Sequence, residues 1–376
     1  MSQITAVTSF VVPYTEPNDH GSTRHVCLVK VIDSDGVVGW GEAVTLFLEA
    51  AMATGALLTG LNELLVGLPA EPAGVAQAII DHGWWYADSG IACFASSAID
   101  LALWDIVGKR ENTSLLELLD SKQDHMKVVV SCHATESHLQ AMAVAMADTV
   151  RSRNAIGIKV GFGKRGEAAL GFEHDRDVEF VRHLRTALGP DSLMMIDIGA
   201  KIHWSVEEAI ARISAFDECD VHWTEEPLGA EDPVGYRRLK DSVRSLIAYG
   251  EREWSPKGYE RILRTGTVDV IGIDPGRAGG VTGFVAALEL AHRSGAQANA
   301  HAFAGPITFV ASLALSQSST TCHQLEQMPL KNTLYGLIEG APEASDGVLR
   351  SRMLPGLGLM VDEDAVRRTA AALFEC

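Results

Sequence analysis

The chain has 376 residues, of which 47% are hydrophobic, so it is long enough for one large domain and a smaller second unit. Its formal net charge of −18 argues against nucleic acid or an anionic membrane surface as a partner. The six cysteines are scattered without a C-x-x-C pair, there is no signal-peptide pattern, and no apolar run approaches the roughly 18 residues of a membrane span. We therefore expect a cytoplasmic protein with reduced thiols.

Residues 1–125 predict a small α+β domain. Three runs within residues 4–44 alternate in the manner of strands, ITAVTSFVV, HVCLVKVID and VVGWGEA, and the turn at 33–36 indicates a hairpin between the last two. The polar segment 13–24, PYTEPNDHGSTR, is interrupted by proline and glycine and is predicted to be a loop. Helical character follows over residues 46–108, most clearly in SSAIDLALWDIVGK.

Residues 126–330 alternate between strand-like and helix-like segments, which predicts a sheet of parallel strands. The first two strand candidates are KVVVSCH and AIGIKVGFG, and the segment DVEFVRHLRTALG is an amphipathic helix that ends at Gly189. After residue 330 the alternation fades into a segment rich in glycine and proline, residues 331–376.

Six charged or titratable residues follow short apolar runs in this second region, about 25 residues apart, which is roughly the length of one strand–helix unit in a (β/α)₈ barrel. They are Asp197, Glu225, Glu251, Asp274, His301 and Glu326. Active sites of such barrels lie at the C-terminal ends of the strands, where these residues fall. The spacing therefore predicts one active site at the mouth of a barrel.

The first three residues of this series, Asp197, Glu225 and Glu251, are carboxylates. Three carboxylates that converge from neighbouring strands repel one another unless a cation lies among them. Oxygen ligands of this kind suit Mg²⁺, which keeps coordination positions open for water or substrate. Any one of them alone could be an ordinary salt-bridged side chain, but three at successive strand ends predict a magnesium site.

The other residues of the series predict acid–base chemistry. Asp274 and His301 end neighbouring strands, and an aspartate bonded to one imidazole nitrogen fixes the tautomer and raises the basicity of the other nitrogen. Lys159 ends the second strand among apolar residues and is either a base or an electrostatic stabiliser. Glu326 ends the last strand, where it either donates a proton or hydrogen bond to substrate or forms a salt bridge.

A metal flanked by bases on two sides favours one reaction class. A substrate carboxylate that binds Mg²⁺ has its charge partly neutralised, so that the proton on its α-carbon becomes removable, and the metal stabilises the ene-diolate that results. We therefore expect a small-molecule carboxylate as substrate and abstraction of its α-proton as the chemical step.

These residues resemble the enolase superfamily, specifically its mandelate racemase/muconate lactonizing enzyme-like subgroup. The similarity runs over almost the whole chain, through VVGWGEA, SSAIDLALWDIVGK, IKVGFG, LMMID, WTEEPL, AYGERE, IDPGRAGGVTG, NAHAF and LPGLGLMVD. The resemblance implies an α/β fold in which an N-terminal α+β capping domain, residues 1–125, covers a modified TIM barrel, (β/α)₇β, of residues 126–330. It also implies that residues 331–376 return to the cap.

The resemblance further implies that Asp197, Glu225 and Glu251 bind Mg²⁺ and that Asp274 and His301 form the acid–base dyad. Loops of the cap, within residues 13–24 and around 44–49, would close over the substrate and set specificity. A symmetric homo-oligomer is also expected from the resemblance.

Two positions depart from the pattern of the family. The usual Lys-x-Lys of the second strand is Gly157-Ile158-Lys159 here, so the first lysine, whose charge would depress the pKa of the second, is missing. This favours chemistry with one base, His301, over two-base racemisation. The residue two positions after Asp197 is glycine instead of the frequent asparagine or histidine, which leaves Lys201 and His203 as possible substrate contacts, together with Arg24 of the cap.

The leading hypothesis is a Mg²⁺-dependent dehydratase that converts a sugar acid, an aldonate or aldarate, into a 2-keto-3-deoxy acid. The alternatives are a racemase or epimerase that uses Lys159 and His301 on opposite faces, or a lactone cycloisomerase. An alternative from another class is a non-catalytic binding homologue, which the intact Asp274–His301 pair argues against. The identity of the carboxylate substrate and the oligomeric state are not readable from the sequence, and fold analogy alone does not supply them.

Overall fold

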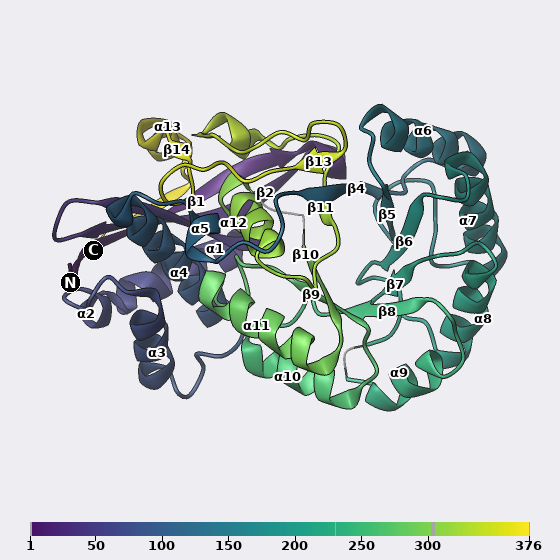
Figure 1. The fold of residues 1–376 in the computed structure, drawn as a ribbon, viewed down its shortest axis with the longest axis horizontal. Coiled ribbons are helices and arrows are strands. Elements are labelled where there is room, and N and C mark those ends of the chain that lie inside the picture. The colour runs from purple at the N-terminus through teal and green to yellow at the C-terminus, as the bar shows by residue number, and fades with distance from the viewer. Residues whose placement is uncertain (1, 230, 302–304, 376) are drawn as a thin grey trace.

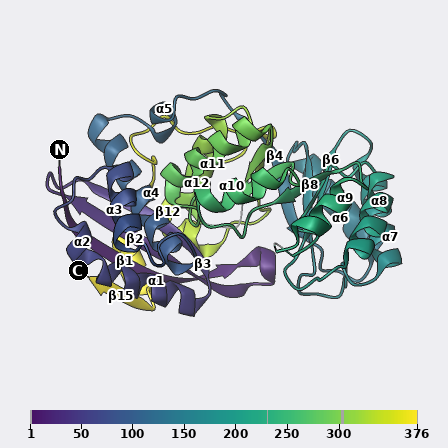
Figure 2. The ribbon, with the colours of Figure 1, turned by 90° about the horizontal axis from the view of Figure 1, so that it is seen from below.

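The computed structural model describes residues 2–229, 231–301 and 305–375. An N-terminal unit consists of a four-stranded antiparallel sheet with helices packed on it, and lies beside a barrel of parallel strands (Figure 1). The sheet has the order β15-β1-β2-β3, with β1 (Ile4–Glu16), β2 (Ser22–Asp33), β3 (Val38–Leu46) and β15 (Ala372–Glu375). The helices of this unit are α1 (Leu48–Gly60), α2 (Asn62–Leu65), α3 (Pro72–His82), α4 (Ile91–Glu111) and α5 (Leu115–Leu118). Figure 2 shows the same arrangement from below.

Helix α4 lies directly on β3, and two glycines of the VVGWGEA motif explain the close approach. A Cβ atom added at Gly39 or Gly41 would collide with the backbone carbonyl of Ala102 or Ala98 in α4. Glycine without a side chain therefore lets helix and strand backbones approach. Helix α4 is also long and apolar enough to cross a membrane by composition, but 78% of its apolar window is buried inside the protein, as in a core helix.

The predicted loop over residues 13–24 is wrong in most of its length. Strand β1 continues to Glu16 and β2 begins at Ser22, so that only the short η1 (Pro17–Asp19) and the residues after it form the turn. Pro13 fits inside a strand because β15 pairs only with residues 8–11 of β1, and beyond them that edge of β1 has no partner strand in the part of the chain described. A proline, which lacks the N–H donor, is tolerated at such an edge.

The barrel confirms the predicted modified TIM barrel with seven strand–helix units and a final strand. Its strands are β4 (Met126–His133), β5 (Gly157–Phe162), β6 (Leu193–Ile198), β7 (Trp223–Glu225), β8 (Leu246–Tyr249), β9 (Val270–Ile273), β10 (Gln297–Ala300) and β11 (Leu325–Gln327). The intervening helices are α6 (Leu139–Ser152), α7 (His174–Leu188), α8 (Val206–Asp217), α9 (Pro233–Lys240), α10 (Pro256–Thr265), α11 (Gly280–Ser294) and α12 (Pro306–Gln317). The strands pair in parallel in the order β10-β9-β8-β7-β6-β5-β4-β11. A hydrogen bond from the Ala298 amide of β10 to the Thr321 carbonyl, just before β11, joins the two ends of this sheet.

The C-terminal segment runs back across the barrel to the N-terminal unit (Figure 1). It contains η2 (Thr333–Gly336), β12 (Ile338–Glu339), β13 (Val348–Leu349), β14 (Met360–Val361) and α13 (Glu363–Thr369) before β15. Strand β13 pairs with β4 of the barrel, whereas β15 pairs with β1 of the cap. The largest buried apolar cluster likewise includes both cap residues, such as Phe10 and Leu28, and barrel residues, such as Ile158. One apolar cluster therefore joins the cap to the barrel, beside a second cluster within the cap and a small third one among the barrel strands.

Candidate active site

A cavity of about 440 Å³ lies where the cap meets the C-terminal ends of the barrel strands. The cap contributes residues from the β1–β2 turn region and from the end of β3, including Arg24, Leu46 and Phe47. The predicted site residues that line the cavity are Lys159, Asp197, Glu251, His301, Glu326, Arg24 and Lys201. Glu225 and Asp274 lie directly behind the residues that line the cavity: Glu225 contacts Lys159, and Asp274 contacts His301. His203 is exposed and is not part of the described cavity lining.

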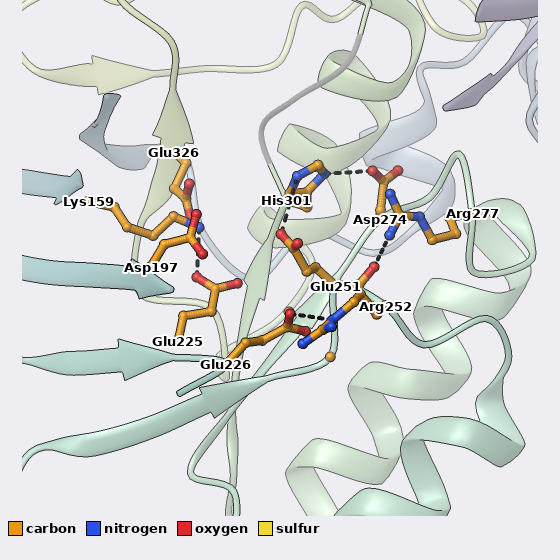
Figure 3. Close-up of polar contacts among 12 residues, drawn as sticks. Lys159, Asp197, Glu225, Glu226, Glu251, Arg252, Asp274, Arg277, His301 and Glu326 are labelled. Carbon is orange, nitrogen blue, oxygen red and sulfur yellow. Dashed lines mark hydrogen bonds and ion pairs between the residues drawn. The ribbon is translucent and has the colours of Figure 1, made fainter. Parts of the chain in front are cut away.

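The three predicted metal ligands come from consecutive strands. Asp197 in β6 and Glu225 at the end of β7 are direct partners in the parallel register, and Glu251 follows β8 by two residues. Each carboxylate faces a cationic or titratable side chain of the protein, and Figure 3 shows this for Glu225 and Glu251. Asp197 Oδ2 lies 3.3 Å from Lys164 Nζ, Glu225 Oε2 lies 2.7 Å from Lys159 Nζ, and Glu251 Oε2 lies 3.6 Å from His301 Nε2.

The charge of this acidic cluster is only partly compensated. Burial raises the pKa of Glu225 to about 7, since the charge of Lys159 does not offset burial and the repulsion from Asp197 and Glu251. Burial and the charge of Glu251 also raise the pKa of the adjacent Glu226 well above its usual range, although Arg252 opposes the shift. Buried carboxylates that repel one another in this way attract a cation.

The donor set fits Mg²⁺ in chemical type, number and location at neighbouring strand ends. The side chains as placed do not form a coordination shell, because no three His, Cys, Asp or Glu side chains of the described residues converge closely enough to hold a metal ion. Lys159, Lys164 and His301 engage the carboxylates instead. A metal would therefore have to compete with these contacts, and the assignment of Asp197, Glu225 and Glu251 as ligands stays a prediction.

Lys159 lies almost fully buried in β5 and bridges two acidic side chains (Figure 3). Its Nζ is 2.7 Å from Glu225 Oε2 and 2.8 Å from Glu326 Oε1. Burial favours the neutral amine, but the charges of Glu225 and Glu326 outweigh it and raise the pKa of Lys159 well above its ordinary value. Glu326 also accepts a hydrogen bond of 2.6 Å from Asn299 Nδ2. In this arrangement Lys159 is a cation that stabilises negative charge, and Glu326 is its salt-bridge partner.

The backbone around Gly157 leaves no room for the side chain of the lysine that the family usually has at this position. A Cβ atom at Gly157 would collide with the carbonyl oxygen of Leu193 in the neighbouring strand β6. A second cation nevertheless reaches the site from the loop after β5, because Lys164 binds Asp197. Burial favours neutral Lys164, but the charges of Asp197 and Glu251 raise its pKa. Because Lys164 lies outside the second strand, the Lys-x-Lys pattern of that strand gives no sign of it.

Asp274 and His301 lie on the other side of the cavity, directly after β9 and β10 (Figure 3). Asp274 Oδ2 is 2.8 Å from His301 Nδ1, and Asp274 Oδ1 accepts a hydrogen bond of 2.8 Å from the Gly276 amide. Burial lowers the pKa of His301, but the hydrogen bond to Asp274 and the charge of Glu251 outweigh it, so the net shift is upward. A carboxylate on Nδ1 leaves Nε2 facing the acidic side of the cavity, which is the geometry of a positioned general base.

Of the predicted substrate contacts, Arg24 and Lys201 reach the cavity. The Arg24 guanidinium lies 3.0 Å from Asp19 Oδ2 within the cap, whereas Lys201 is exposed in the loop after β6. Arg165 also lines the cavity, so its outer part carries several positive side chains. Such side chains suit an anionic or hydroxylated ligand.

Sequence reasoning missed several residues that the fold brings to the site. His133 ends β4 and lines the cavity, and burial together with the charge of Lys164 lowers its pKa to about 4, so it is neutral near pH 7. Its place at the end of KVVVSCH, equivalent to those of the predicted residues, was the available signal. Arg252 Nε lies 2.6 Å from Glu226 Oε2, and the Arg277 guanidinium donates to the Glu251 carbonyl. These two contacts join residues of different loops, so no local sequence signal announces them.

Comparisons with known proteins agree with this architecture. Residues 5–120 match the family described as mandelate racemase / muconate lactonizing enzyme, N-terminal domain, and residues 141–365 match the family described as enolase C-terminal domain-like. A D-gluconate dehydratase of Thermoproteus tenax is 29% identical over 368 residues, which cover 96% of this chain and 73% of that protein.

Two solved structures show the same fold. The 3,6-anhydro-D-galactonate cycloisomerase from Zobellia galactanivorans is 26% identical, with a TM-score of 0.87, and the match covers 98% of this chain and 100% of that chain. The L-talarate dehydratase from Polaromonas sp. JS666, solved with Mg and L-glucarate, is 22% identical, with a TM-score of 0.86, and the match covers 100% of this chain and 99% of that chain. At this lower identity the second likeness concerns the fold alone.

Proposed function

Since the chain belongs to the enolase superfamily, as a mandelate racemase-like enzyme of the lyase or isomerase type, we propose that it removes the α-proton of a sugar acid in a Mg²⁺-dependent reaction. The overall reaction is dehydration of an aldonate or aldarate to a 2-keto-3-deoxy acid. The observation that carries this proposal is the 2.8 Å contact between Asp274 Oδ2 and His301 Nδ1, which leaves Nε2 facing the carboxylate cluster across the cavity.

His301 is the general base of the proposed reaction. Its Nε2 takes the proton from the α-carbon of the substrate, and the electron pair of the broken C–H bond moves into the carboxylate to form an ene-diolate. The pair then expels the β-hydroxyl, which leaves as water after it receives a proton. Because His301 holds the abstracted proton at that moment, the same imidazole can return it to the leaving group on one face of the substrate. The enol product tautomerises to the 2-keto acid.

The opposite side of the cavity stabilises the charge of the ene-diolate. Asp197, Glu225 and Glu251 would hold the Mg²⁺, which when bound neutralises negative charge on the substrate carboxylate. The ammonium of Lys159, buried between Glu225 and Glu326, adds a fixed positive charge on the same side. It acts as an electrostatic stabiliser, because its raised pKa makes it a poor base at neutral pH.

The outer part of the cavity favours a polar substrate. Arg24, Arg165 and Lys201 line it, and side chains of this kind donate hydrogen bonds to hydroxyl groups and to a second carboxylate. D-gluconate, the substrate in the name of the Thermoproteus tenax relative, is a sugar acid of the same class. We also expect a soluble cytoplasmic homo-oligomer, as the sequence predicts.

The test is proton NMR of the Mg²⁺-loaded enzyme in D₂O with a panel of aldonic and aldaric acids. A new 2-keto-3-deoxy product with one deuterium at C3 is expected, and the His301→Asn protein run in parallel should leave the substrate unchanged. Exchange of the C2 proton without dehydration would move the assignment to an epimerase. No reaction with any acid of the panel would contradict the proposed substrate class.

Cycloisomerisation of a lactone or an anhydro-sugar acid is the second candidate, and the likeness to the 3,6-anhydro-D-galactonate cycloisomerase favours the anhydro-sugar acid. It uses the same removal of an α-proton but needs no loss of water. Adding lactones and anhydro-sugar acids to the NMR panel separates the two reactions, because a cycloisomerase consumes these cyclic compounds whereas a dehydratase consumes the open-chain acids.

A further inference from the structure

The two barrel helices that follow the dyad strands begin without a cap of their own. Helix α11 follows Asp274 and has Gly279 as its N-cap residue, and α12 follows His301 and has Gly305. Neither glycine has a side chain to accept hydrogen bonds from the first-turn amides, which have no partner inside the helix. Among the other barrel helices, α6, α8 and α9 are capped by their own N-cap side chains, whereas α7 and α10 have no side-chain cap.

The missing acceptors for α12 come from the cap domain, from Glu42 of β3. Glu42 Oε1 accepts hydrogen bonds from the Gly305 amide at 2.6 Å and from Thr308 Oγ1 at 3.1 Å. Its Oε2 accepts from the amides of Ile307 at 3.2 Å and Thr308 at 3.4 Å. Glu42 is completely buried, so water cannot replace it at these amides.

The pKa of the Glu42 carboxyl is raised to about 7, because the effect of burial outweighs the hydrogen bonds from Gly305 and Thr308, which act to lower it. The nearby charge of Asp274 opposes ionisation as well. The side chain is therefore a buried acidic group that the proposed proton transfer does not use, held in place by its contacts with the start of α12.

The helix after Asp274 is held in the same way by α4 of the cap. The Gly279 amide donates to Ser97 Oγ at 2.8 Å, and the Thr282 amide donates to Asp100 Oδ1 at 3.0 Å. Strand β3 adds a third link, because the Val44 amide donates at 3.1 Å to the carbonyl of Gly276, whose own amide binds Asp274. The cap thus holds the starts of both helices that follow the dyad strands, α11 and α12.

The contact between Glu42 and the start of α12 requires glycine at residue 305, because the carboxylate packs closely against it. A Cβ atom added at Gly305 would lie 2.7 Å from Glu42 Oε2 and 2.8 Å from Oε1, closer than real Cβ contacts allow. The absence of a side chain at residue 305 and the carboxylate from another domain therefore form a matched pair. The two residues are 263 positions apart in the sequence.

We propose that Glu42 is a positioning residue for His301: by capping α12 from the neighbouring domain, it fixes Gly305 and the start of this helix, four residues after the imidazole in the chain. The inference rests on the proposed function for its kinetic consequence, but the contact it describes exists without substrate. Removing the carboxylate leaves several buried amides unsatisfied, and the start of α12 shifts to find other acceptors. The imidazole then loses its fixed place 2.8 Å from Asp274.

The test compares Glu42→Gln with a matched control, Asp105→Asn. Asp105 is also a buried carboxylate of the cap that accepts from a β3 amide, that of Trp40 at 3.1 Å, but its second backbone partner is Leu357 of the C-terminal segment. We expect Glu42→Gln to lower kcat by about 10²-fold with KM changed less than about threefold, since a small displacement of a catalytic group costs about this much. Asp105→Asn should lower the melting temperature and leave kcat near that of the wild type.

A second measurement needs neither substrate nor metal. The imidazole N–H that donates to Asp274 gives a low-field proton NMR signal, identified by its absence from the His301→Asn protein. Glu42→Gln should shift or broaden this signal, and Asp105→Asn should keep it. If Glu42→Gln does not fold, Gly305→Ala tests the same contact from the barrel side and should have the same effect.

The two measurements separate the failure of this inference from the failure of the proposed function. A wild-type protein that turns over no sugar acid but loses the low-field signal on Glu42→Gln would refute the function and keep the positioning role. A folded Glu42→Gln or Gly305→Ala protein with wild-type kcat and an unchanged signal would overturn the positioning role.

Discussion

The two halves of the barrel mouth are built on different physical grounds. In the dyad half, at the ends of β9 and β10, Asp274 and His301 are in contact, and the cap domain holds the starts of the helices α11 and α12 that come after them. In the carboxylate half, at the ends of β6 to β8, lysines of the barrel hold Asp197 and Glu225, and Glu251 faces His301 of the dyad. Among the residues described, these acidic side chains do not converge on a common point.

This difference teaches what each half requires. A proton-transfer group needs a fixed position and tautomer, which hydrogen bonds from a second domain can supply. A cluster of buried carboxylates instead needs charge compensation, and a cation supplies this better than geometry does. Variants of the dyad half should therefore change catalysis with little effect on metal binding, whereas variants of the carboxylate half should change the response to metal.

The largest effect is expected for His301→Asn. Because asparagine cannot take a proton from the α-carbon, turnover should fall by about 10³-fold or more. The Mg²⁺-induced rise in melting temperature should persist, since the proposed ligands Asp197, Glu225 and Glu251 remain. Thermal unfolding with and without Mg²⁺, next to the NMR assay, checks both statements. Turnover at the wild-type rate would remove His301 from the mechanism.

Asp274→Asn should have the next largest effect, a loss of about 10²- to 10⁴-fold in kcat/KM, because the amide cannot hold the Nδ1–H tautomer in the same way. The net pKa of His301 is raised above its ordinary value of 6.5, so the supply of unprotonated base falls as the pH drops through that raised value. We expect the acid limb of the pH profile to move to lower pH in Asp274→Asn.

The raised pKa of His301 also makes the stability of the fold depend on pH, and here the protonated imidazole is the favourable form. A raised pKa in the folded state means that the imidazolium stabilises the fold below pH 6.5, and that this contribution is lost as the pH rises through the raised value. The pH dependence of unfolding should be weaker in Asp274→Asn. An unchanged acid limb together with unchanged pH-dependent stability would mean that Asp274 does not set the pKa of His301.

Glu225→Gln tests the carboxylate half through stability. Its pKa is raised from 4.5 to about 7, so its protonated form stabilises the metal-free fold below pH 4.5 and this stabilisation is lost as the pH rises through about 7. The variant should therefore match or exceed the metal-free stability of the wild type at pH 8. Its stabilisation by Mg²⁺, about 2.7 kcal/mol for the wild type at 100 times Kd, should largely disappear. An unchanged response to Mg²⁺ would exclude Glu225 as a ligand.

The smallest effect is expected at the rim. Lys201→Ala removes an exposed positive charge from the cavity lining, and exposed charge contacts contribute little, so KM should rise about two- to fivefold with kcat unchanged. Lys122→Ala, which removes an exposed lysine paired with Asp120 outside this cavity, is the matched control. Equal KM values for both variants would mean that Lys201 does not contact the substrate.

The sequence alone determined the fold and the positions of the main candidate residues. Each candidate lies in or just after a barrel strand, and the C-terminal ends of parallel strands meet at one edge, so regular spacing along the chain becomes proximity in space. Asp197, Glu225 and Glu251 could be placed on neighbouring strands for this reason, and Asp274 could be paired with His301.

Only the tertiary structure decided the contacts that cross loops and domains. The loop position of Lys164, the unassigned His133 and the ion pair of Glu226 with Arg252 depend on how loops fold back over the mouth, which no local periodicity encodes. The contact of Glu42 with the start of α12 joins residues 263 positions apart. Side-chain hydrogen bonds of this kind form after the two domains have packed, so the close approach of β3 to the barrel, rather than the pattern within either segment, selects them.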